Sequence, residues 1–155
     1  MTNSERAVQL FQNGMNCSQA ILTAFGEPYG VDLQTAEKLG RPLGGGLART
    51  GMTCGALTGA ILVLGMAQSE TRDEAEARMQ VFRSVQELLR RFEERRGSSL
   101  CKILLGADMS TEAGAKKIKE ENLTAQLCPG FVRDTAEILS QILNSQAERS
   151  MMKSA

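Results

Sequence analysis

Four cysteines are the residues of this chain best suited to chemistry, because the sequence has no histidine. A cysteine thiolate is both the nucleophile of disulfide exchange and a soft metal ligand. Without histidine, mixed Cys–His zinc sites, facial-triad iron sites and a Cys–His nucleophilic dyad are excluded. The sequence therefore predicts a thiol site, as catalytic residues or as metal ligands, formed by Cys17, Cys54, Cys101 and Cys128.

The spacing of the cysteines narrows the kind of site. They are separated by 37, 47 and 27 positions, and no C-x-x-C pair occurs. This pattern argues against a ribbon-type zinc site, a ferredoxin-type cluster and a thioredoxin motif. Dithiol/disulfide pairs and a four-thiolate site both stay open. A third possibility is that the cysteines are inert, since free cysteine is among the most buried residue types.

Helix starts are the predicted surroundings of three cysteines. A helix N-terminus offers free amides and a partial positive charge, which favour the thiolate. Because one pole of a bundle can collect helix starts, we expect all four thiols to converge, with Cys54 the most acidic and reactive. The three predicted starts are Cys17 after Asn16, Cys54 after Thr53, and Cys128 before Pro129.

Glycines surround the second cysteine. A glycine-rich loop lets backbone amides approach an anion or a cluster sulfur, so these glycines are candidate cofactor-binding residues. The alternative is a flexible connector followed by a small helix residue that permits close packing. The glycines concerned are Gly44, Gly45 and Gly46 before Cys54, and Gly55 after it.

Start and stop signals predict an all-α, single-domain multi-helix bundle of about six to eight helices over residues 1–155, with a frayed tail from about 147 to 155. No stretch alternates with period two, and residues 40–51 read as a loop. The predicted helices begin at Ser4 as a cap, at 17, at Asp32 as a cap, at Thr53 as a cap, at a Thr71–Glu74 capping box, near 101, near 110 and at Pro129.

The long helix after the capping box, ending at Gly97, has an apolar residue every three or four positions. This spacing predicts one buried stripe, opposite a charged face with a favourable Glu87–Arg91 pair. The stripe consists of Ala75, Met79, Phe82, Val85, Leu89 and Phe92.

Charge and composition favour a cytoplasmic protein that binds neither nucleic acid nor lipid. Net charge is zero, lysine and arginine are mixed with acids, and aromatic residues make up 4% of the chain. Basic patches and base-stacking surfaces are therefore not indicated. The most apolar stretch, 52–67, is shorter than the roughly 20 residues a membrane span needs, and residues 1–20 have no apolar signal-peptide core. A homo-oligomer and an unidentified redox partner stay open.

With these residues in place, the chain resembles the C_GCAxxG_C_C family of redox-active proteins. Its motif here reads Cys54-Gly55-Ala56, and Leu43 precedes the triple glycine where many members have phenylalanine. The resemblance implies a redox role, with an iron–sulfur cluster or zinc as candidate cofactors. The matching segments are Asn16-Cys17-Ser18-Gln19-Ala20, Gly44 to Gly46, Cys54 to Ala60, Cys101 with Leu104-Leu105-Gly106, and Cys128.

Three hypotheses for function follow. The first is a cytoplasmic thiol redox protein, an oxidoreductase if it turns over, whose cysteines form dithiol/disulfide pairs or hold a redox metal centre. The second is a non-catalytic binding or carrier protein for zinc, copper or an iron–sulfur cluster. The third is a structural helical module with inert cysteines.

Overall fold

The computed structural model describes residues 1–67 and 73–154, and this part of the chain is an all-α bundle of eight α-helices. The expected multi-helix fold is confirmed. The helices are α1 (Asn3–Gln12), α2 (Cys17–Phe25), α3 (Leu33–Gly40), α4 (Gly55–Met66), α5 (Glu74–Arg96), α6 (Cys101–Leu105), α7 (Glu112–Glu120) and α8 (Leu123–Ser154).

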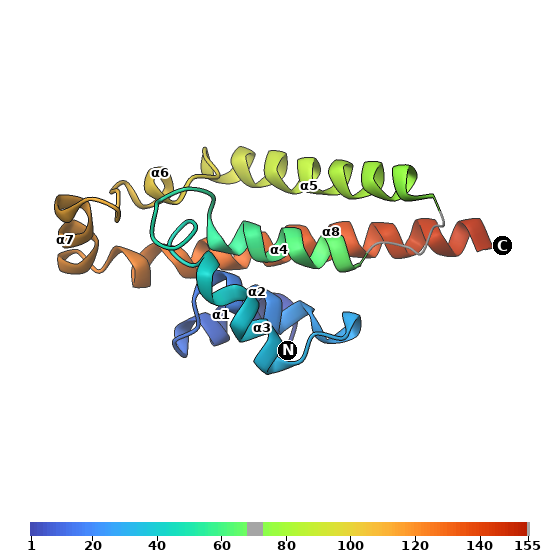
Figure 1. The fold of residues 1–155 in the computed structure, drawn as a ribbon, viewed down its shortest axis with the longest axis horizontal. Coiled ribbons are helices and arrows are strands. Elements are labelled where there is room, and N and C mark those ends of the chain that lie inside the picture. The colour runs from blue at the N-terminus through green and yellow to red at the C-terminus, as the bar shows by residue number, and fades with distance from the viewer. Residues whose placement is uncertain (68–72, 155) are drawn as a thin grey trace.

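Helices α4, α5 and α8 run along the long axis of the molecule, α1–α3 cover one side, and α6 and α7 lie at one end (Figure 1). The chain directions of α5 and α8 are opposite. Ion pairs join the end of α5 to α8, at 2.6 Å between Arg96 and Asp134 and 3.0 Å between Arg95 and Glu137. The core between the helices contains the fully buried Ile21, Leu57, Leu88, Phe92, Val132 and Leu139.

Several predicted helix ends are confirmed. The Asn16 side chain caps α2, Asp32 caps α3, and Gly97 ends α5 with a φ of 83°. The first helix is capped by Thr2 instead of Ser4, because the Thr2 hydroxyl accepts from the Glu5 amide while the Glu5 carboxylate accepts from Thr2. The predicted capping residue Thr71 lies outside the described residues, and the described N-cap of α5 is Asp73.

The last helix does not start at Pro129, which corrects the sequence prediction. Helix α8 begins six residues earlier, at Leu123, and Pro129 lies inside it. Proline there removes one helical hydrogen bond, the one to the carbonyl of Ala125, and Ala125 is exposed. Cys128 is therefore in the body of a helix. At its other end α8 stays helical to Ser154, through the tail expected to fray.

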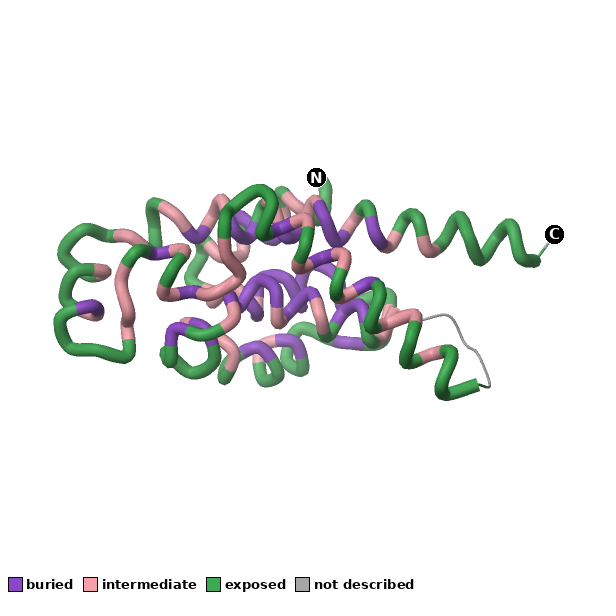
Figure 2. Tube along the Cα trace, turned by 90° about the horizontal axis from the view of Figure 1, so that it is seen from above, coloured by how far each residue is buried: buried purple, intermediate pink, exposed green. Residues whose placement is uncertain are grey.

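The apolar stripe predicted along α5 is buried only in its second half. Of the predicted residues, Phe92 is buried and Val85 and Leu89 are partly buried, whereas Met79 and Phe82 are 49% and 51% exposed. The reason is geometric, since the start of α5 and the end of α8 extend beyond the other helices and have few neighbours (Figure 2). The buried Leu88 lies outside the predicted stripe. The expected Glu87–Arg91 ion pair is present at 3.9 Å.

Within the described ranges, no helix combines the length and apolar character needed to cross a lipid bilayer.

Candidate thiol site

Close packing of α2 on α4 brings the first two cysteines together. A Cβ added to Gly55 would lie 3.3 Å from the Cys17 Cβ, and one added to Gly59 would lie 3.0 Å from the Ser18 carbonyl oxygen. Glycines at these two positions, one helical turn apart, therefore let the backbone of α2 approach α4. Cys17 is the first residue of α2 and Cys54 is the N-cap of α4, so their side chains meet at this contact.

Two polar side chains fix the start of α2. Asn16 accepts from the Gln19 amide at 2.9 Å, and Gln19 accepts from the Asn16 amide at 3.0 Å. The same side chains donate outward, Asn16 to the carbonyl of Gly40 at 3.1 Å and Gln19 to that of Glu37 at 2.9 Å. One capping box thus ties the helix that carries Cys17 to the end of α3.

Cys101 reaches the site through a short backbone pairing. Thr53 and Leu100 form an isolated antiparallel bridge. The amide of Cys54 donates to the Ser99 carbonyl at 2.8 Å, and the amide of Cys101 donates to the Met52 carbonyl at 2.6 Å. This pairing places the start of α6 beside the start of α4, as the two segments lie in Figure 1.

Cys128 completes the group from α8. Cys128 is buried, and its thiol forms a hydrogen bond with the thiol of Cys17. The structure therefore brings the four predicted cysteines together, Cys17 in contact with both Cys54 and Cys128, and Cys101 near enough to respond to their charges. All four are free thiols. Three of them do begin helices, but the third is Cys101 and not Cys128.

The surroundings shift the pKa values of the thiols in different directions. The hydrogen bond from Cys17 lowers the pKa of Cys54, against its burial, and the amides of Ala56 and Leu57 act in the same direction although neither makes a regular capping hydrogen bond. Hydrogen bonds to Cys128 and Cys54, then burial, hold the pKa of Cys17 well above that of an ordinary thiol. Burial, then the charges of Cys54 and Cys128, raise the pKa of Cys101 to about 12. Cys54 is thus the thiolate that the site favours.

The loop before α4 is wound with a left-handed sense. Five consecutive residues, 45–49, have φ between 50° and 70°, and three of them are not glycine. Left-handed backbone costs roughly 1–2 kcal/mol per non-glycine residue, so such runs persist only where their surroundings hold them. Here backbone bonds close the loop on itself, from Met52 to Gly46 at 2.9 Å and from Gly51 to Gly45 at 3.1 Å.

The four glycines expected to bind a cofactor each face the protein's own atoms. A Cβ at Gly46 would lie 2.7 Å from the Cys101 Cβ, one at Gly45 would lie 2.7 Å from the Met109 sulfur, and one at Gly44 would lie 2.7 Å from the Asn16 amide nitrogen. Gly55 faces Cys17 as described above. The loop therefore packs against Asn16, Met109 and Cys101, and its glycines permit that close approach.

The fit of a metal was tested on the same side chains. In the described ranges, no three or more histidine, cysteine, aspartate or glutamate side chains are arranged to hold a metal ion. The chemical steps proposed below therefore use the thiols alone.

Part of the site gave no signal in the sequence. Ser99 and Leu100 position Cys101 through backbone bonds, which any residue type can make, and Met109 contacts the loop from a distant segment. Asn16 and Gln19, by contrast, form a recognisable capping pair on either side of Cys17.

Comparison with known proteins gives one match. A family model described as "Putative redox-active protein (C_GCAxxG_C_C)" matches residues 15–142, which include all four cysteines and the glycine-rich loop. No curated protein matches this chain, and no solved structure does.

Proposed function

Because the chain belongs to the C_GCAxxG_C_C family, we propose that it is a thiol redox protein that cycles between a dithiol and a disulfide. The observation that carries this proposal is the direct contact between Cys17 and Cys54, whose pKa values are displaced in opposite directions. An acidic thiol beside a protonated one is the arrangement that thiol–disulfide exchange requires.

The proposed reaction has two exchange steps. The Cys54 thiolate attacks a disulfide substrate, and one substrate thiolate leaves as a mixed disulfide forms. Cys17 then gives up its proton and attacks the Cys54 sulfur, which expels the second substrate thiolate and leaves a Cys17–Cys54 disulfide. One disulfide is reduced to two thiols while two protein thiols are oxidised, so electrons balance. We assign the protein to the cytoplasm, whose reducing poise returns such a pair to the dithiol.

The Gly44–Gly46 loop has a structural part in this proposal. It lies against Cys101, and Cys54 and Cys101 are both buried, so the loop limits how a substrate reaches the sulfur atoms. Cys101 contributes through its position, since a neutral thiol at that place adds no negative charge beside the Cys54 thiolate.

The test is a redox titration of the fully reduced protein with oxidised glutathione under anaerobic conditions. We expect loss of two free thiols per chain, recovery of both with dithiothreitol, and slower oxidation of Cys54→Ser than of Cys101→Ser. Free thiols that resist oxidation in the folded protein would refute the proposal and favour the inert module.

Elemental analysis of the same anaerobic preparation addresses the metal-carrier alternative. Stoichiometric zinc, copper, or iron with sulfide, lost on Cys54→Ser, would replace the dithiol proposal with a metal site.

A further inference from the structure

Cys17 occupies a central position among the thiols. It comes from α2, and its side chain contacts Cys54 at the start of α4 and Cys128 in α8. The close approach of α2 to α4 at Gly55 fixes the first contact. The second follows from α8 packing against both α2 and α4. One sulfur atom thus has two possible disulfide partners, on two different helices.

We propose that Cys17 is the shared sulfur of an internal disulfide relay, in which the disulfide moves from Cys17–Cys54 to Cys17–Cys128. The relay rests on the proposed thiol redox function and adds a residue role to it. Cys54 receives the oxidising equivalent from substrate, and Cys128 stores it. The class of substrate is an exposed disulfide of a small molecule or protein, which is the only co-reactant the relay needs.

The transfer balances without any further oxidant. Cys128 releases its proton to solvent, and its thiolate attacks the sulfur of Cys17. A Cys17–Cys128 bond forms, the Cys17–Cys54 bond breaks, and the electron pair of the broken bond goes to Cys54. Thiolates of low pKa leave faster, and Cys54 is the thiol whose pKa the site lowers. The transfer therefore leaves Cys54 as a thiolate again, ready to attack another substrate disulfide.

Cys101 is placed outside the relay by backbone geometry. In the antiparallel pairing of Thr53 with Leu100, Cys54 lies opposite Ser99 and is therefore diagonal to Cys101. Diagonal positions of an antiparallel pair have Cα atoms about 7–8 Å apart, at or beyond the limit for a disulfide without backbone movement. A Cys54–Cys101 bond is accordingly not the expected product.

Disulfide mapping during oxidation tests the relay. Reduced protein is mixed with oxidised glutathione, quenched with acid and N-ethylmaleimide at successive times, and digested with trypsin. Lysines and arginines separate the four cysteines into different peptides, which are residues 7–38, 50–72, 97–102 and 120–133.

In the wild type, we expect the 7–38 peptide linked first to 50–72 and later to 120–133. Cys128→Ser should stop at the first product and hold about tenfold more of it at the end point. Ala147→Gly, on the exposed surface of α8, is the control and should follow the wild-type course. Cys17→Ser should form neither disulfide, with its fold checked by circular dichroism.

The outcomes separate the two proposals. A lasting Cys17–Cys54 disulfide in the wild type, unchanged by Cys128→Ser, would overturn the relay and leave the thiol redox function standing. A Cys54–Cys128 or Cys54–Cys101 disulfide as the main product would also overturn it. Absence of any reversible disulfide in the wild type would overturn both.

Discussion

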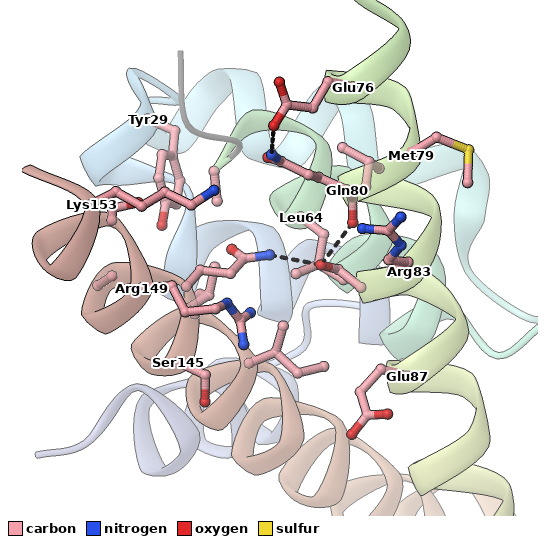
Figure 3. Close-up of a pocket in the computed structure, with 18 of the residues that line it drawn as sticks. Tyr29, Leu64, Glu76, Met79, Gln80, Arg83, Glu87, Ser145, Arg149 and Lys153 are labelled. Carbon is pink, nitrogen blue, oxygen red and sulfur yellow. Dashed lines mark hydrogen bonds between the residues drawn. The ribbon is translucent and has the colours of Figure 1, made fainter. Parts of the chain in front are cut away.

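The two ends of the bundle differ in how tightly their backbone is held. At the thiol end, an added Cβ at Gly44, Gly45 or Gly46 would lie under 3.0 Å from a neighbouring atom. At the other end, α5 and α8 border an open groove of ≈ 950 Å³, with Met79, Arg83, Arg149 and Lys153 among its lining residues (Figure 3). Helix α4 joins these ends, and near its far terminus a Cβ added to Gly65 would meet no atom of the described residues within 4 Å outside its own helix backbone and chain neighbours.

This difference shows where the fold restricts the sequence. The thiol end combines buried sulfur atoms, left-handed backbone and crowded glycines. Each of these features costs folding free energy unless the surrounding structure holds it in place. The groove end has mostly exposed helix surfaces, where single substitutions usually change the free energy of unfolding by about 0.5 kcal/mol or less. Substitutions of the same type at the two ends should therefore have opposite or very unequal effects.

The largest contrast is expected between Gly46→Ala and Gly65→Ala. At Gly46 the new methyl group would lie 2.6 Å from the Met52 nitrogen, on a backbone with a φ of 68°. Strain and overpacking together should lower the free energy of unfolding by about 3 kcal/mol. At Gly65 the methyl enters open space in a helix and should add up to about 1 kcal/mol. Urea unfolding of both variants measures the difference, and equal midpoints would show that the two ends are equally tolerant.

Alkaline pH should lower the free energy of unfolding through Cys101. The pKa of this thiol rises from the usual 9.0 to about 12 in the folded chain. Between these values the unfolded thiol loses its proton while the folded one keeps it. Stability is therefore fully present below pH 9 and falls as pH rises toward 12, by about 2 kcal/mol after allowance for solvent screening. Urea unfolding from pH 8 to 11 under reducing conditions should show a shallower decline for Cys101→Ser. Identical slopes would mean that Cys101 is not shielded by the fold.

The contrast between the ends also explains what the sequence allows one to predict. Local signals located α2, α3 and the end of α5, since Asn16, Asp32 and Gly97 act on neighbouring amides and carbonyls. The start of α8 was misplaced because a proline that is typical of a first turn is also tolerated inside a helix where the carbonyl it leaves free faces solvent.

Long-range contacts account for the remaining differences. The position of Cys101 depends on the Thr53–Leu100 bridge, whose backbone bonds have no sequence signature. The exposure of Met79 and Phe82 depends on where the other helices end. The spacing of apolar residues along α5 cannot predict that. The convergence of the cysteines was predicted from helix starts gathering at one pole. That reason holds for Cys17, Cys54 and Cys101 but not for Cys128, which lies inside α8.

A smaller effect should come from relieving strain in the left-handed loop. Ala48 has a φ of 50° and is exposed, so glycine there removes backbone strain of about 1 kcal/mol while increasing the freedom of the unfolded chain. Ala48→Gly should be neutral or slightly stabilising. The matched variant Ala147→Gly, on the exposed surface of α8, should cost about 0.5–1 kcal/mol. Thermal melts compare the two, and a larger loss for Ala48→Gly would argue against strain in the loop.

A comparable effect is expected at the groove, where a polar contact joins α5 to α8. The Gln146 amide donates to the Ser84 hydroxyl at 2.7 Å, and that hydroxyl donates to the Gln80 carbonyl at 3.1 Å. The Gln146 Oε1 atom is buried and has no hydrogen-bond partner among the described residues. Ser84→Ala should cost about 1 kcal/mol, because it leaves both ends of this amide unpaired. Gln146→Leu should cost less, because it removes the unpaired oxygen and leaves Ser84 its bond to Gln80. Both variants should oxidise at the wild-type rate, as measured with oxidised glutathione, since neither residue contacts a cysteine. A slower rate in either variant would show that the groove and the thiol end are coupled.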